Sequence, residues 1–172
     1  MNINDLKQRH EIINFLRSYI KKPRGFVVFT GDCGTGKTYA AKAVYNAISP
    51  YTLPEYDADI AIFVNQSEMN NIWNKELKEQ GHWSHSMKLL SNTKLLVIDD
   101  LGKKIPTDSF LDFLYCLVDK RCDSRDRLGT IITTNLSILD IREKFGEAFA
   151  SRTLSGTNFL FDGKDRRFIN GF

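Results

Sequence analysis

Apolar residues follow two different spacings that alternate along the chain. Several short runs are almost continuously apolar and rich in β-branched or aromatic residues, a pattern that is typical of buried strands. Glycine, proline or polar residues bound these runs. The predicted strands cover residues 25–30, 60–64, 94–98, 129–134 and 158–161.

Apolar side chains at helical spacing predict one helix before the first strand and one after each strand except the last. The first of these segments carries Leu6, Ile13 and Leu16 on one stripe and ends before Pro23. The predicted helices cover residues 5–21, 40–48, 67–80, 108–122 and 138–154. Because strands that alternate with helices form parallel sheets covered on both faces, we expect an α/β fold of three layers around a mostly parallel, five-stranded sheet.

Length and composition favour one globular domain. The chain has 172 residues, which lies within the range of about 100–200 residues that one domain usually occupies. Its content of 42% hydrophobic and 26% charged residues is typical of a globular protein and disfavours a disordered or fibrous one. Within the single domain we expect an N-terminal helix at 1–24 and a core at 25–172.

Several other classes of protein are excluded. No apolar run approaches the roughly 18 residues of a membrane span, and the N-terminus lacks the basic start and apolar stretch of a signal peptide. The cysteines Cys33, Cys116 and Cys122 fit neither a disulfide framework nor a zinc site. Residues 82–85 contain two histidines without acidic neighbours, which indicates a solvated loop. We therefore expect a cytoplasmic protein with no membrane contact, whose net charge of +3 does not by itself indicate nucleic acid.

A phosphate-binding loop is the strongest chemical signal in the chain. Residues 31–38, GDCGTGKT, match the motif G-x-x-x-x-G-K-[ST] between a predicted strand and a predicted helix. Such a loop surrounds phosphate with backbone N–H groups and the positive end of a helix. Lys37 is expected to reach the β and γ phosphates, and Thr38 to bind Mg²⁺. Cys33 is better explained as a small filler than as a redox control. The predicted residues for ATP or ADP are Gly31, Asp32, Cys33, Gly34, Thr35, Gly36, Lys37, Thr38 and Tyr39.

Two carboxylates, Asp99 and Asp100, directly follow the predicted strand at 94–98, which is a Walker B pattern. Ligands of open parallel sheets bind at the carboxyl ends of the strands. Asp99 is therefore expected to hold Mg²⁺ through its waters, and Asp100 to orient and deprotonate the attacking water. The polar residues 133–135 end the next strand, where the Asn135 amide could hydrogen-bond the γ-phosphate or the water. An asparagine that starts a turn explains that position almost equally well.

Together these motifs resemble those of AAA+ ATPases, in particular the bacterial helicase loaders of the DnaC and DnaI type and the related IstB transposition helpers. The segments that carry the resemblance, within residues 25–167, are GDCGTGKT, LLVIDDLG, IITTNLS, FGEAFASRT and FDGKDRR. It implies that Asn135 is the sensor 1 residue, Arg152 an arginine finger for a neighbouring subunit's nucleotide, and Arg166 a sensor 2-like residue. A guanidinium keeps its charge and offers a planar fork of donors, which suits phosphate oxygens. A surface ion pair explains Arg166 equally well and Arg152 less well.

The resemblance also implies a function. The chain is expected to bind and hydrolyse ATP, slowly without self-association through Arg152 or contact with DNA, and to act on a hexameric, DnaB-like replicative helicase and single-stranded DNA. Alternatives are an IstB-like transposition helper, a weakly hydrolysing switch or inhibitor that docks on a helicase or loader, and a small nucleotide kinase.

Two departures from the pattern modify these expectations. Most AAA+ proteins carry glutamate where Asp100 stands, and the shorter side chain favours slow hydrolysis. Loaders usually carry a helicase-binding domain before the ATPase core, whereas 24 residues precede the first predicted strand here. The chain then ends at Phe172. A bare AAA+ core without a helical lid domain is therefore expected.

Overall fold

The computed structural model describes residues 10–49, 60–80, 84–124 and 128–162 of the chain. Its elements are α1 (His10–Lys21), β1 (Gly25–Thr30), α2 (Lys37–Ile48), β2 (Ala61–Asn65), α3 (Gln66–Gln80), α4 (Ser84–Asn92), β3 (Leu95–Leu101), α5 (Asp108–Asp123), β4 (Gly129–Thr134), α6 (Ile138–Phe145), α7 (Glu147–Leu154) and β5 (Thr157–Leu160). No helix in these ranges is long and apolar enough to cross a membrane.

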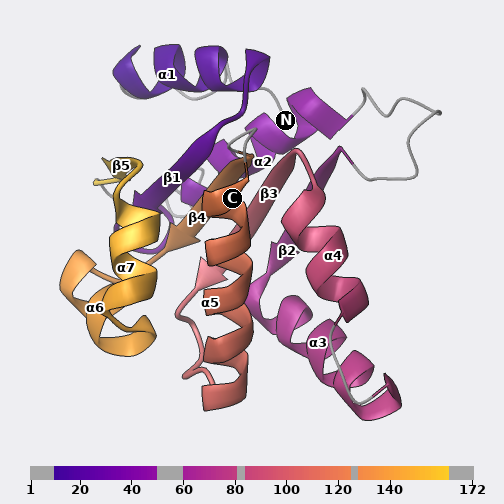
Figure 1. The fold of residues 1–172 in the computed structure, drawn as a ribbon. Helices are drawn as coiled ribbons and strands as arrows, with labels where there is room; N and C mark the ends of the chain where they lie inside the picture. Colours follow the sequence, from indigo (N-terminus) through magenta and orange to yellow (C-terminus); the bar gives the residue numbers. More distant parts are fainter. Residues whose placement is uncertain (1–9, 50–59, 81–83, 125–127, 163–172) are drawn as a thin grey trace, which may run out of the picture.

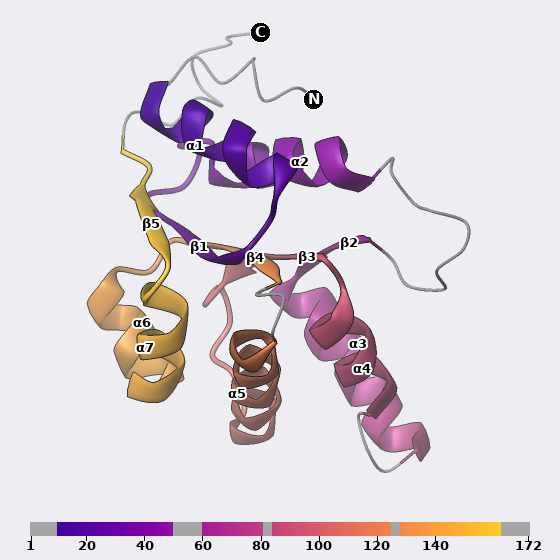
Figure 2. The same cartoon turned by 45° about the horizontal axis from the view of Figure 1, so that its top comes forward.

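The five strands form one sheet in the order β2-β3-β4-β1-β5, and each neighbouring pair is parallel. Helices α1 and α2 cover one face, and α3 to α7 cover the other, so that three layers are visible in Figures 1 and 2. The predicted α/β fold is therefore confirmed. Because β4 lies between β1 and β3, the carboxyl ends of these three strands meet at one edge of the sheet.

The central strands β1, β3 and β4 are rich in apolar and β-branched residues because both of their faces are buried. In β1, Val27 and Phe29 pack under α1 and α2, whereas Phe26 and Val28 belong to the core on the opposite face. Every residue of β4 is buried. The sheet is therefore held from both sides, which fixes the positions of the loops at its carboxyl edge.

The predicted strands at 25–30 and 129–134 have the observed bounds. Three other expectations were wrong. The stretch 138–154 is two helices separated at Gly146, whose φ of 84° lies outside the helical region. The third strand continues to Leu101 instead of ending before the acidic pair. His85 belongs to helix α4, which the sequence analysis did not predict, and not to a loop.

Helix α4 begins against a buried carboxylate from α3. The side chain of Glu76 accepts hydrogen bonds from the N–H of His85 at 2.7 Å, from the N–H of Ser86 at 2.9 Å, and from the Ser86 hydroxyl. Burial by itself raises the pKa of Glu76, but these hydrogen bonds more than offset it and hold the pKa below its ordinary value. A residue distant in sequence thus caps the first turn of α4.

Glu76→Gln should lower the free energy of unfolding by about 1–3 kcal/mol at pH 7, because charge-assisted hydrogen bonds to α4 are lost. A carboxyl whose folded-state pKa is depressed stabilises the protein above its unfolded-state pKa, and this contribution is lost as the pH falls through the folded-state pKa. The difference in the free energy of unfolding between variant and wild type should therefore shrink below pH 4.5, the ordinary pKa of a glutamate. Denaturant titrations at several pH values measure it. Glu79→Gln, on an exposed residue of the same helix, is the control. Equal effects of the two substitutions would contradict the capping role.

Candidate functional site

The predicted phosphate loop connects β1 to α2. Gly31 has a φ of 130°, and a Cβ at this position would collide with the backbone carbonyl of Phe161. Gly36 has a φ of 102° and forms the left-handed N-cap of α2. Thr35 closes the turn with a hydrogen bond from its hydroxyl to the Asp32 carbonyl at 2.8 Å. The glycines therefore permit a tight turn that points the N-terminus of α2 toward the loop.

Lys37, the first residue of α2, extends back along this loop. Its ammonium donates hydrogen bonds to the carbonyls of Gly31 and Asp32, each at 2.7 Å. The residue is only 5% exposed. Burial lowers the pKa of Lys37, and Cys33 and the carboxylate of Asp100 oppose this effect. The structure thus places a buried cation within the loop, where the motif requires one.

Asp99 joins the acidic strand to the phosphate loop. Its Oδ1 accepts a hydrogen bond from the hydroxyl of Thr38 at 2.9 Å and another from the hydroxyl of Thr133 at 2.6 Å. Thr38 lies on α2, Asp99 on β3 and Thr133 on β4. The two residues predicted to hold Mg²⁺, Thr38 and Asp99, are therefore in direct contact.

Asp100 has an unusual backbone conformation. The regular pairing of β3 with β4 shifts between Ile98 and Leu101, and Asp100 has a φ of 55° within this bulge. Its N–H donates to the Thr133 hydroxyl at 3.0 Å, and its carboxylate lies 3.3 Å from the ammonium of Lys103. A left-handed conformation of a residue other than glycine costs about 1–3 kcal/mol, and such conformations cluster at functional sites.

Asn135 follows β4 and reaches the phosphate loop. Its side-chain amide donates a hydrogen bond of 3.2 Å to the sulfur of Cys33. The structure therefore brings together the loop, the acidic pair and Asn135 at the carboxyl edge of the sheet.

Arg152 lies elsewhere, on α7 and on the sheet face opposite α2. Its guanidinium forms an ion pair with Asp119 of α5 at 2.7 Å and stacks 4.9 Å from the centroid of the Tyr115 ring. These contacts form the surface ion pair that is the alternative explanation of Arg152. Arg166 lies outside the described residues.

The oxygen atoms that meet at this edge suit Mg²⁺. A hydroxyl and a carboxylate are hard ligands, and Mg²⁺ at phosphate sites usually takes one or two protein oxygens together with phosphate and water. Within the described ranges no group of three or more His, Cys, Asp or Glu side chains could hold a metal ion. Thr38 and Asp99 therefore fit a metal that is bound jointly with nucleotide.

The hydroxyl of Thr133 was not assigned a role from the sequence. It contacts both acidic residues. Its position two residues before Asn135, near the carboxyl end of the strand, is a sequence signal for a place near the site. Its two contacts depend on the bulge in β3, which the sequence pattern does not reveal.

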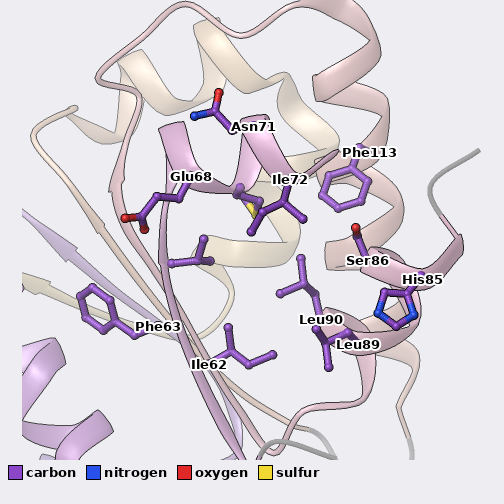
Figure 3. Close-up of a pocket in the computed structure, with 12 residues that line it drawn as sticks. Ile62, Phe63, Glu68, Asn71, Ile72, His85, Ser86, Leu89, Leu90 and Phe113 are labelled. Carbon is purple, nitrogen blue, oxygen red and sulfur yellow. The ribbon is translucent and has the colours of Figure 1, made fainter. Parts of the chain in front are cut away.

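A separate pocket of about 500 Å³ lies between β2 and the helices α3 and α4 (Figure 3). Ile62, Ile72, Leu89 and Leu90 contribute to its lining, which is mostly apolar. None of the lining residues belongs to the phosphate loop or to the acidic pair. The nucleotide site is therefore defined by the contacts described above and not by this pocket.

The sheet order, the loop between β1 and α2 and the acidic pair on β3 define a P-loop NTPase with the AAA+ core fold. The chain belongs to the family of IstB-like ATP-binding proteins, whose model matches residues 4–155. A comparison with curated protein sequences gives no significant match.

Solved structures of replication proteins are similar to this one. The DnaC helicase loader has a TM-score of 0.71 at 22% identity, over 95% of this chain and 96% of that chain. DnaI has a TM-score of 0.73 at 18% identity, over 96% of this chain and 90% of that chain. AMPPCP-bound DnaA from Aquifex aeolicus has a TM-score of 0.79 at 14% identity, over 98% of this chain and 52% of that chain, so this chain spans half the length of that DnaA. At these identities the likeness shows the fold alone.

Lys37→Ala should weaken ATP binding by about 100-fold or more, because it removes a buried cation that would pair with phosphate. Calorimetric titration with ATP and Mg²⁺ measures the affinity, and circular dichroism checks that the fold is retained. Lys42→Ala is the matched control, since Lys42 is an exposed residue of the same helix. Unchanged affinity in the Lys37 variant would contradict the assignment of the loop.

Proposed function

We propose that this protein is an ATP-hydrolysing accessory protein of DNA replication that acts, like a helicase loader, on a hexameric replicative helicase. The contact between Thr38 and Asp99 at 2.9 Å carries the ATP-hydrolysing part of the proposal. It joins the phosphate loop to the acidic strand, which are the two parts that nucleotide hydrolysis with Mg²⁺ requires. Membership of an ATP-binding family supports the same conclusion.

The residues at the carboxyl edge of the sheet have distinct proposed roles. Backbone N–H groups of residues 31–38 and the Lys37 ammonium would bind the phosphates. Thr38 and Asp99 would hold Mg²⁺, which neutralises phosphate charge when it is bound. The Asp100 carboxylate would orient the attacking water and accept its proton, while the Asn135 amide would hydrogen-bond the water or the γ-phosphate. A water is the nucleophile in this proposal, which separates it from a nucleotide kinase.

Self-association would bring a further positive charge, the Arg152 guanidinium of a neighbouring subunit, to the nucleotide phosphates. Arg152 lies on α7, which covers the face of the sheet opposite α2 (Figure 2), and its guanidinium contacts Asp119 and Tyr115. To act as an arginine finger it would exchange Asp119 for the phosphates of a neighbouring subunit. The proposed oligomer would therefore hydrolyse ATP faster than the single chain.

The proposed partners follow from the similar structures. DnaC is called a helicase loader, and a DnaA structure contains single-stranded DNA. We therefore propose that this chain contacts a DnaB-like hexamer and single-stranded DNA. Co-purification with the replicative helicase of the source cell, dependent on ATP, tests this step, and a helicase that fails to bind in any nucleotide state would contradict it.

An IstB-like transposition helper is the second candidate, because the family that matches the chain is the IstB-like one. A helper would bind DNA and a transposase instead of a helicase. Binding assays with both partners, in the presence of ATP and Mg²⁺, distinguish the two functions.

Asp100→Asn should retain binding of ATP and Mg²⁺ but lower kcat by about 100-fold or more, because the proposed base is neutralised. Asp99→Asn should first raise the Mg²⁺ concentration needed for half-maximal turnover. Steady-state phosphate release measured over a Mg²⁺ titration separates these effects. Asp112→Asn, on an exposed residue of α5, is the control. Equal hydrolysis by wild type and Asp100→Asn would refute the role of Asp100.

Turnover per subunit should rise with protein concentration, because an arginine finger supplied by a neighbour contributes about 10³–10⁵ in rate where it has been measured in other systems. Arg152→Ala and Lys37→Ala should each be nearly inactive. Mixing the two should restore partial activity, since some interfaces then join an intact loop to an intact Arg152. A mixture as inactive as either variant, beside a wild type whose turnover depends on concentration, would exclude Arg152 as the finger.

A further inference from the structure

We propose that Thr133 is a positioning residue whose single hydroxyl holds both acidic residues of the site in place. This inference rests on the proposed hydrolysis, because it concerns the residues that would carry it out. The hydroxyl donates to Asp99 Oδ1 at 2.6 Å and accepts from the Asp100 N–H at 3.0 Å. The proposed metal-binding carboxylate and the proposed base therefore share one hydrogen-bonding partner.

The bulge in β3 explains why a side chain is needed at this point. Ile98 pairs with Ile132 and Leu101 pairs with Thr134, so two residues of β3 lie opposite the single residue Thr133. A bulge leaves an extra residue outside the regular ladder of backbone hydrogen bonds. The Thr133 hydroxyl takes the place of a ladder partner for the Asp100 N–H, and it supports the positive φ of Asp100.

Thr133 itself has little freedom to move. It is fully buried, and β4 is paired on both sides, with Phe29 of β1 opposite Thr133. A hydroxyl offers one donor and two acceptor positions, and the structure uses the donor for Asp99 and an acceptor for Asp100. A displacement at one acidic residue is thus transmitted to the other through a fixed group.

The next residue provides a matched control. Thr134 is also buried, and its hydroxyl donates to the Leu101 carbonyl at 2.6 Å and accepts from the Leu136 N–H at 3.1 Å. Thr134 therefore lies on the same strand as Thr133, and its hydroxyl likewise donates one hydrogen bond and accepts one. Neither of its hydrogen bonds involves a carboxylate. Thr133→Val and Thr134→Val should cost similar stability, and only Thr133→Val should disturb the site.

The experiment compares Thr133→Val, Thr133→Ser and Thr134→Val by unfolding, by steady-state hydrolysis and by calorimetry of ADP with and without Mg²⁺. Thr133→Val should lower kcat and weaken the Mg²⁺-dependent part of ADP binding by about 10- to 100-fold, as expected for the loss of a group that orients a ligand. The KM for ATP should change less than kcat. Thr133→Ser, which keeps the hydroxyl, should restore kcat to within about threefold of wild type. If the valine variant fails to fold, Thr133→Cys makes the same comparison, because a thiol is a weak donor and acceptor.

Equal losses of kcat in Thr133→Val and Thr134→Val would overturn the proposal, and so would a serine variant as impaired as the valine variant. A wild type without any hydrolysis would instead refute the proposed function. In that case the Mg²⁺-dependent ADP affinity still tests the link from Thr133 to Asp99, and an unchanged affinity in Thr133→Val would overturn that link.

Discussion

Two hydroxyl groups that bind one carboxylate oxygen connect the three parts of the proposed site. Thr38 lies in the first turn of α2, and Thr133 is the second-last residue of β4. Both hydroxyls donate to Oδ1 of Asp99 on β3. Because a buried carboxylate loses its hydration, it is tolerated only where hydrogen bonds replace water. The hydroxyls provide this compensation, and in doing so they fix the distance between the phosphate loop and the acidic strand.

The sheet order makes this contact possible. With β4 between β1 and β3, the carboxyl ends of these strands lie side by side, and Asn135 reaches Cys33 from the end of β4. The bulge in β3 then determines the direction of Asp100, whose backbone has a φ of 55°. The reach of this short carboxylate therefore depends on the backbone as much as on the length of the side chain.

Much of this arrangement could be predicted from local sequence patterns. The strands at 25–30 and 129–134 are runs rich in β-branched residues that begin with a glycine, and the phosphate loop has a fixed spacing between its glycines and Lys37. The missed elements depend on contacts between distant residues. Helix α4 is short and is capped by Glu76 of α3. A surface ion pair is one of the two sequence-based explanations of Arg152, but the sequence does not identify its partner, Asp119, on another helix. The register shift that gives Thr133 two partners likewise has no local sequence signal.

The most direct measurement is a crystal structure with ADP and Mn²⁺ in place of Mg²⁺, in which anomalous scattering locates the metal. The metal is predicted to be bonded to the Thr38 hydroxyl, next to Asp99, with the β-phosphate inside the loop at residues 31–38. The Thr38 hydroxyl should bind the metal through a lone pair of its oxygen and keep its hydrogen bond to Asp99. A nucleotide outside this loop, or a metal away from Thr38 and Asp99, would contradict the proposed site.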